Sequence, residues 1–167
     1  MHVVTTPRDR DAAGRARNAR PRDEAGRPLP HGAQGVERVP EDLQLTGDGA
    51  VTEAQRLLDA GQPFAAHEVL EGAWKAAPEP ERELWRALAQ LAVGLTHAQR
   101  GNARGAVALL DRAAGHLATW DGAAPAALAI SDVRAHAGAL ARRIERDGVA
   151  DLADDDLRPR LRGAIRG

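Results

Sequence analysis

The sequence predicts an all-α fold: a small bundle of about five helices in antiparallel hairpins, preceded by a disordered or extended N-terminal arm. Three observations lead to this expectation. Only 2% of the 167 residues are aromatic and tyrosine is absent, whereas β-sheets favour β-branched and aromatic side chains. From residue 52 onward, apolar residues recur with the period of an α-helix. Glycine, proline and asparagine punctuate that region at intervals that suit ordinary helices.

Residues 1–46 differ in composition from the rest and are expected to form a polar arm. Residues 1–40 hold eight arginines and five acidic residues, so they carry +3 and the remainder carries −4 of the total −1. This region also has scarcely any large apolar side chain before Leu43. Burial of apolar surface therefore cannot offset the entropy cost of ordering this part of the chain. The stretch RDAAGR at residues 10–15 recurs as RDEAGR at residues 22–27. Either this is low-complexity drift, or two extended turns lie along the acidic domain and pair with it through arginine.

Residues 47–148 are expected to form the helical domain. Thr52 followed by Gln55 has the spacing of a capping box, in which two side chains bond the free amides at a helix start. Gly61 is a residue type that commonly follows the end of a helix. These signals predict a first helix at residues 52–60.

Proline and glycine bound the second and third helices. Pro63 suits the first turn of a helix that runs to about residue 77, because proline lacks an amide hydrogen that would be unpaired there anyway. Pro78 breaks this helix. The next helix is expected over about residues 81–100, where Gly101 stops it.

Two further helices complete the predicted bundle. Asn102 can cap a helix that runs to about residue 119, since its side chain can accept from an amide in the first turn. Ser131 can cap the last helix, which is expected to end just before Gly148. Residues 149–167 separate acidic residues from arginines and are expected to form a charged C-terminal tail.

An internal repeat relates the first two hairpins. In each unit a glycine is followed by an alanine, a leucine and a second alanine at the same spacing. Glycine ends one helix, and the small alanines let the next helix approach closely. The spacing resembles the second helix of a tetratricopeptide hairpin, although only two units are present. The two sets are Gly61, Ala66, Leu70 and Ala73, and Gly101, Ala106, Leu110 and Ala113.

The second predicted helix carries a polar cluster that suggests a site. Projected at about 100° per residue, one face is apolar, and the other combines two aromatic residues with a histidine and two carboxylates. Phenylalanine and tryptophan are unusual on a solvated face, so this side is expected to be covered or to line a cleft. The residues on it are Phe64, His67, Glu68, Glu71 and Trp74.

The third helix is expected to supply partners for this face. A short turn at residues 78–80 makes the second and third helices antiparallel neighbours, which brings Trp74 near Trp85. A polar stripe along the third helix then faces the second helix. The cluster expected to converge on one point consists of His67, Glu68 or Glu71, Gln90 and His97, with Arg86 beside it.

Three interpretations of this cluster stay open. The polar groups can be structural, with Glu71 accepting from Gln90 or Arg86 and the histidines fixing helix register. In the second interpretation, His67, Glu71 and His97 bind a divalent metal, because an i,i+4 spacing places two ligands on one helical face. In the third, the cluster is a metal-free acid–base site for a small polar ligand. A zincin protease is not indicated, since the second histidine of that motif is missing.

Composition excludes several kinds of site and partner. Without cysteine, the chain forms no disulfide, thiolate metal site or cysteine nucleophile. No apolar run approaches the ~20 residues of a membrane span, and the N-terminus lacks the pattern of a secretory signal. We therefore expect a soluble, cytoplasmic protein without a membrane partner. A net charge of −1, and arginine-rich stretches without interleaved aromatics, disfavour nucleic acid as a partner.

The helical centre resembles a known family. FAAHEVLEGAW at residues 64–74 is followed by AQLAVGLTH at residues 89–97 and RGNARGA at residues 100–106. This succession is similar to the family called domain of unknown function 309, over roughly residues 52–120. The resemblance implies a small all-α bundle of bacterial type and supplies no reaction. The positions it singles out are His67, Glu68, Glu71, Trp74, Gln90, His97, Asn102 and Gly105.

A binding module is the leading expectation for the function. The groove between the second and third helices would bind a small ligand or a partner segment, with the protein's own N-terminal arm as one such segment. The alternative is a metal-dependent, hydrolase-like enzyme that uses His67, Glu71 and His97. A divalent metal is the one cofactor that the sequence suggests.

Overall fold

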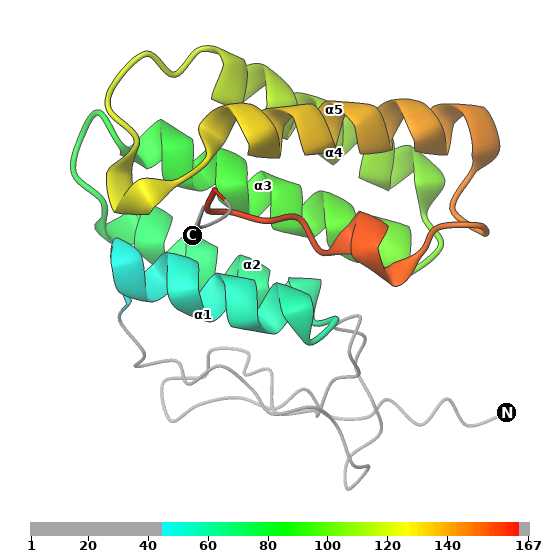
Figure 1. Cartoon of the computed structure of the whole chain (residues 1–167), viewed down its shortest axis with the longest axis horizontal. Helices are drawn as coiled ribbons and strands as arrows, with labels where there is room; N and C mark the ends of the chain where they lie inside the picture. Colours follow the sequence, from blue (N-terminus) through cyan, green and yellow to red (C-terminus); the bar gives the residue numbers. More distant parts are fainter. Residues whose placement is uncertain (1–44, 164–167) are drawn as a thin grey trace, which may run out of the picture.

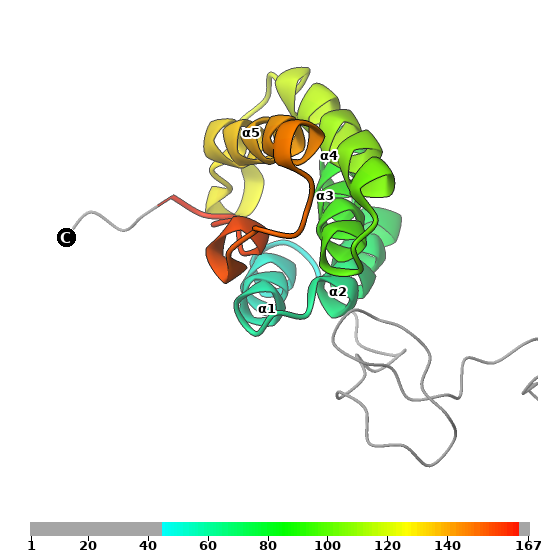
Figure 2. The same cartoon turned by 90° about the vertical axis from the view of Figure 1, so that its right-hand side faces the viewer.

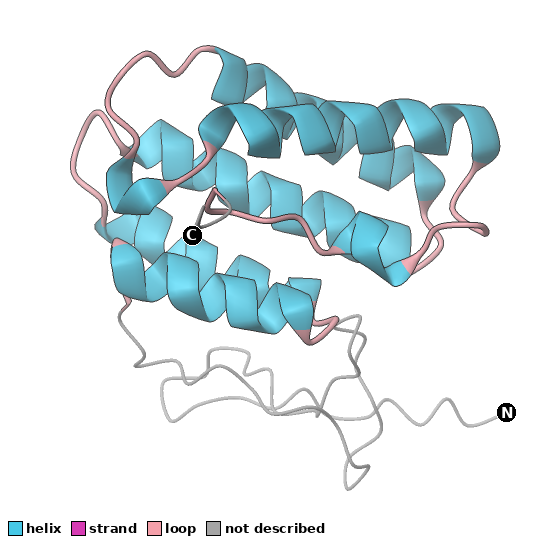
Figure 3. Ribbon diagram, in the orientation of Figure 1, coloured by secondary structure: helices cyan, strands magenta, loops and turns pink. Residues whose placement is uncertain are grey.

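The computed structural model describes residues 45–163 and confirms the all-α fold. Five α-helices and two 3₁₀ turns make up this part of the chain, which contains no strand (Figures 1 and 3). The predicted arm lies almost wholly outside the described residues. The helices are α1 (Asp48–Asp59), α2 (Pro63–Ala76), α3 (Arg82–Gln99), α4 (Ala103–Ala118) and α5 (Ile130–Asp147), and the 3₁₀ turns are η1 (Pro125–Ala127) and η2 (Asp154–Leu157).

Each α-helix packs mainly against its neighbours in the sequence. Seen end on, the helices follow a curved path from α1 to α5, and the C-terminal segment lies between these two helices (Figure 2). Such sequential packing is what short connections between antiparallel helices produce. Within residues 45–163, no helix combines the length and the apolar character that crossing a bilayer requires.

Helix α1 starts earlier than the sequence predicts. It begins at Asp48, after Gly47 with a positive φ of 56°, so the capping box expected at Thr52 and Gln55 is wrong. Both side chains belong to residues inside the helix and bind the C-terminal segment instead. The Arg162 guanidinium, for example, donates to Thr52 Oγ1 at 2.9 Å. A local spacing cannot distinguish a cap from a contact made by residues more than a hundred positions away.

Local chemistry explains the starts of α2 and α4, whereas the cap predicted for α5 is not formed. Pro63 occupies the first turn of α2, as predicted. At the start of α4 the side chain of Asn102 accepts from the amide of Gly105 at 3.0 Å, which confirms the predicted cap. Ser131 does not cap α5, because the helix already begins at Ile130 and the serine lies within its first turn.

The internal repeat is visible in the hydrogen bonds that end α1 and α3. Gly61 and Gly101 both adopt positive φ, at 74° and 83°. In both places the following amide donates to the carbonyl five residues earlier, at 2.9 Å from Gln62 and 2.8 Å from Asn102. The two hairpins therefore turn in the same way, whereas the tetratricopeptide likeness stays a prediction. The other members of both repeat units are buried: Ala66, Leu70, Ala73, Ala106, Leu110 and Ala113.

The C-terminal segment contributes to the core. Leu161 is fully buried and belongs to the same hydrophobic cluster as the helices, and Pro159 beside it is buried too. The sequence indicated only a charged tail here, because arginines at residues 158, 160 and 162 dominate its composition. Burial of every second residue is the pattern of an extended segment packed on one side.

Small residues set the distance between α3 and α4. A Cβ atom added at Gly94 of α3 would lie 2.9 Å from Leu110 Cγ and 3.2 Å from the Leu110 backbone nitrogen. Leu110 is fully buried in α4 and has little room to withdraw. Glycine at this position therefore permits a close approach that a larger residue would prevent.

We expect Gly94→Ala to destabilise the protein by about 1–3 kcal/mol, because the added methyl group overpacks the contact between α3 and α4. The matched control is Gly72→Ala on an exposed turn of α2, where nothing lies within 4 Å of the new Cβ. There, the higher helix propensity of alanine should stabilise the fold by up to ~1 kcal/mol. Urea denaturation followed by circular dichroism measures both, and shifts of the same sign would contradict the packing argument.

Candidate functional site

A pocket of about 240 Å³ lies between α2 and α3. A space of this size can take a small molecule or a few side chains of a partner. Five of the residues singled out in the sequence line it, together with two apolar residues of α3. The lining consists of His67, Glu71 and Trp74 from α2 and of Arg86, Ala89, Gln90 and Val93 from α3.

Glu71 lies between two basic side chains of its own helix. Its carboxylate oxygens are 3.2 Å from His67 Nε2 and 2.9 Å from Lys75 Nζ, each one turn away. The His67 side chain is only 23% exposed. This burial lowers the pKa of His67 from its ordinary value of 6.5, an effect that the charge of Glu71 opposes and that of Lys75 reinforces. Burial thus favours the neutral form of the His67 imidazole.

The neutral state determines what His67 can offer to a ligand. A carboxylate only accepts, so Nε2 carries the proton that faces Glu71 and Nδ1 remains an acceptor. His67 Nδ1 is buried without a hydrogen-bond partner in residues 45–163, and so is Gln90 Oε1. A buried acceptor without a donor costs about 1–3 kcal/mol. The described part of the chain therefore leaves two acceptor groups beside the pocket unsatisfied.

Trp74 and Arg86 contribute aromatic and cationic character to the lining. The guanidinium carbon of Arg86 lies 5.7 Å from the centroid of the Trp74 ring, within cation–π range. Arg86 also pairs with Glu83 at 3.7 Å, but that contact is long and solvent-exposed, so it contributes little. The guanidinium has five N–H donors, so several remain for an anionic or carbonyl group.

His97 does not line this pocket, which corrects the expected convergence of two imidazoles. Its Nδ1 lies 3.1 Å from Nδ2 of Asn102, and a Cβ at Gly105 would lie 3.0 Å from its ring. The start of α4 therefore holds His97 near the C-terminal end of α3. Within the described residues, no group of three or more histidine or acidic side chains could hold a metal ion. The divalent site expected from His67, Glu71 and His97 is thus not formed.

Three other expected residues do not line the pocket. Glu68 is exposed on α2. The Phe64 ring lies 5.8 Å from the His67 ring, and the Arg100 guanidinium lies 5.7 Å from the Phe64 ring. Phe64 therefore supports His67 from the side. Trp85 is a core residue with 2% exposure, and it makes no part of the lining.

Sequence reasoning missed Ala89, Val93 and Lys75. The two apolar residues follow Arg86 at i+3 and i+7, so a projection of the third helix contained the signal that they share its face. Lys75 follows Glu71 by four residues, the usual spacing of an ion pair along a helix. That spacing indicates a partner for the carboxylate from sequence alone.

A comparison with protein families gives a match to part of the helical domain. Residues 51–109, from α1 into α4, match the model of a family described as a domain of unknown function (DUF309). This confirms the resemblance found in the sequence, and the matched segment includes every residue that lines the pocket. Searches of curated proteins and of solved structures gave no match.

We expect thermal stability to fall between about pH 7.5 and pH 5.5, and to fall less in His67→Gln. The lowered pKa of His67 sets the sign, because below pH 6.5 the unfolded chain takes up a proton that the folded chain resists. The contribution of His67 is fully present above that pH and is lost as the pH falls toward its folded pKa. Differential scanning calorimetry across this range measures it. An identical pH dependence in the variant and the wild type would contradict a buried, neutral His67.

Proposed function

Because the family match names no activity, we propose that the pocket between α2 and α3 binds a small polar ligand or a segment of a partner chain. The observation that supports this function is the pair of buried acceptors, His67 Nδ1 and Gln90 Oε1, without donors in the described residues. Both atoms are closed to solvent, so a ligand with an N–H or O–H group would reach them only after side chains of the lining move, and it would then remove a cost of about 1–3 kcal/mol for each. That gain is available only to a ligand with donors.

The remaining lining restricts the ligand further. Trp74 and Val93 suit an apolar or planar group, while Arg86 suits a carbonyl or an anion. A short peptide segment supplies amide donors, carbonyl acceptors and an apolar side chain together, and its size suits about 240 Å³. The N-terminal arm is one candidate for this segment, and it lies outside the described residues.

The geometry favours binding over the enzymatic alternative. The His67–Glu71 pair has the residue types of an acid–base couple. However, the described lining contains no serine, threonine or lysine that could act as a nucleophile beside it. The expected metal ligands do not come together either.

Gln90→Leu is expected to be neutral or stabilising, by up to ~1 kcal/mol, because it removes a buried acceptor that has no donor. The comparison variant is Gln99→Leu on the same helix, which also removes a buried Oε1 without a donor but in addition breaks a hydrogen bond made by Nε2. The Gln99 side chain donates to the carbonyl of Gly61 at 2.8 Å, so its loss should destabilise by about 1 kcal/mol. Thermal and urea denaturation compare the two variants. Strong destabilisation by Gln90→Leu would indicate a structural role and count against a ligand site.

A fragment screen by NMR tests the binding function directly. Fragments with an N–H or O–H donor next to a planar or anionic group should shift the indole signal of Trp74 and amides around Gln90. The same fragments should bind Gln90→Leu about tenfold more weakly, since one hydrogen bond to a buried acceptor is lost. Hits that cluster elsewhere, or that bind Gln90→Leu as well as the wild type, would exclude this pocket.

A further inference from the structure

The C-terminal residues 154–163, which we call the strap, are bound as a peptide is bound in a groove. The Gln55 side chain of α1 contacts the strap backbone twice: Nε2 donates to the Pro159 carbonyl at 3.1 Å, and the Leu161 amide donates to Oε1 at 2.8 Å. From the other side, the Ala129 amide donates to the Leu161 carbonyl at 2.8 Å. Main-chain contacts of this kind hold an extended segment whatever its side chains are.

Two side chains of the strap supply specificity. Leu161 is fully buried in the core, whereas Arg160 before it is exposed. Arg162 is held by acceptors from α1 and from η1. Its guanidinium donates to the Ala126 carbonyl at 3.0 Å, Thr52 Oγ1 at 2.9 Å, the Asp48 carbonyl at 3.1 Å and the Asp48 carboxylate at 3.2 Å. The groove thus accepts a leucine followed by an arginine.

The loop that faces the strap holds a costly conformation. Ala126 and Ala127 both have φ of 55°, a region that costs a non-glycine residue about 1–2 kcal/mol. The bond from Arg162 to the Ala126 carbonyl and the antiparallel bridge between Leu128 and Arg162 hold the loop there. Such strain persists where surrounding contacts determine the backbone, and here those contacts come from the strap.

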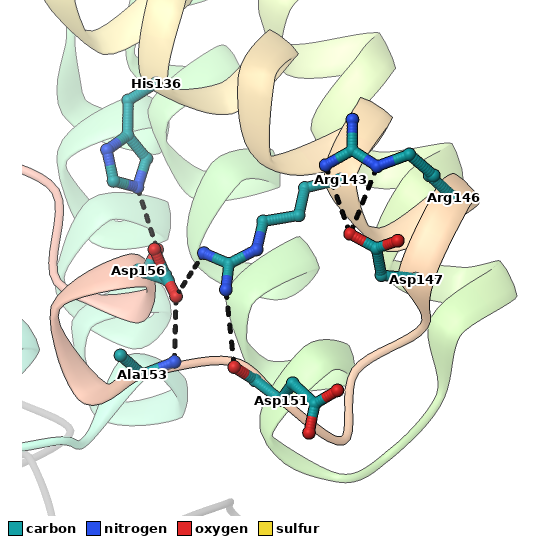
Figure 4. A network of polar contacts seen from close by, with 7 residues as sticks. All are labelled: His136, Arg143, Arg146, Asp147, Asp151, Ala153 and Asp156. Atoms are coloured by element: carbon teal, nitrogen blue, oxygen red, sulfur yellow. Dashed lines mark hydrogen bonds and ion pairs between the residues drawn. The ribbon is translucent and has the colours of Figure 1, made fainter.

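The start of the strap is anchored separately, on α5 (Figure 4). Arg143 pairs with the Asp156 carboxylate at 2.7 Å, and His136 Nε2 donates to the Asp156 carbonyl at 2.8 Å. The same carboxylate accepts from the Ala153 amide at 2.8 Å. These polar, partly exposed contacts sit outside the groove. The strap therefore has a surface anchor and a distinct inserted part, residues 159–162.

We propose that the groove between α1 and the loop before α5 is a recognition site for an extended partner segment containing leucine followed by arginine, and that the strap fills it as a tethered competitor. The contacts of the strap define what the partner segment must supply. Its backbone would make two hydrogen bonds with Gln55, its leucine would be buried in the core, and its arginine would donate to Asp48 and Thr52. This site is separate from the pocket between α2 and α3 and does not depend on it.

A fluorescently labelled peptide with the sequence of residues 157–163, LRPRLRG, tests the proposal on the full chain. Arg162→Ala weakens the strap, so the variant should bind the peptide at least about tenfold more tightly than the wild type in fluorescence anisotropy. The peptide with Leu161→Ala keeps its charge and should bind about tenfold more weakly, because it leaves the core position empty. Arg160→Ala in the full chain is the matched control and should behave as the wild type.

Gln55→Glu, made in the Arg162→Ala chain, tests the two hydrogen bonds between residue 55 and the peptide backbone. The glutamate keeps an acceptor oxygen but loses the Nε2 donor. It should weaken peptide binding about tenfold. The proposal is overturned if Arg162→Ala keeps its helical circular dichroism but binds the peptide no better than the wild type. Equal binding of the two peptides would also overturn it.

Two further outcomes are decisive. If Arg162→Ala does not fold, Arg143→Ala replaces it in the experiment, because this variant loosens the strap at its anchor on α5. If neither variant folds, the strap is a core element and the proposal is wrong. If the wild type dimerises with concentration and Leu161→Ala abolishes this, the groove serves a second copy of the chain and the partner assignment is wrong.

Discussion

Close approach of consecutive helices is the constraint on which the rest of this structure depends. The chain has one phenylalanine, three tryptophans and no tyrosine, so large side chains cannot fill wide gaps between helices. The core is built mainly from alanine and leucine, and Gly94 stands at a close contact between α3 and α4. Dispersion contacts and apolar burial then come from short distances between backbones rather than from bulky side chains.

This packing also explains the pocket between α2 and α3. Alanines bring the inner faces of the two helices together, while the long side chains of His67, Glu71, Trp74, Arg86 and Gln90 surround a space that is left beside the contact. The pocket is therefore a consequence of residue size along two helices. The ion pairs of its lining run along one helix, as those of Glu71 with His67 and Lys75 do, whereas Arg86 of α3 reaches the Trp74 ring of α2 across the gap. Within the described residues, His67 Nδ1 and Gln90 Oε1 are left without a donor.

The curved arrangement of the helices has a second consequence. A row of helices that pack mainly on their neighbours leaves its first and last members apart, and the strap lies between α1 and α5 (Figure 2). Side chains of α1 that look like capping residues in the sequence are used to hold this segment. The arginine-rich composition of the strap is compatible with burial because only alternate residues face inward.

By itself, the sequence determined the number and approximate position of the five helices in the described part of the chain, because periodicity, proline and glycine act over a few residues; the start of α1 and the cap of α5 differ from the prediction. It determined the asparagine cap of α4 and the two glycine turns for the same reason. It also indicated most residues of the pocket, since helical spacing places them on one face. Tertiary structure decided which distant groups meet: His97 is held by Asn102 instead of joining His67, and Thr52 and Gln55 bind a segment more than a hundred residues away. Local patterns carry no information about such pairs, because their distance depends on how every intervening helix packs.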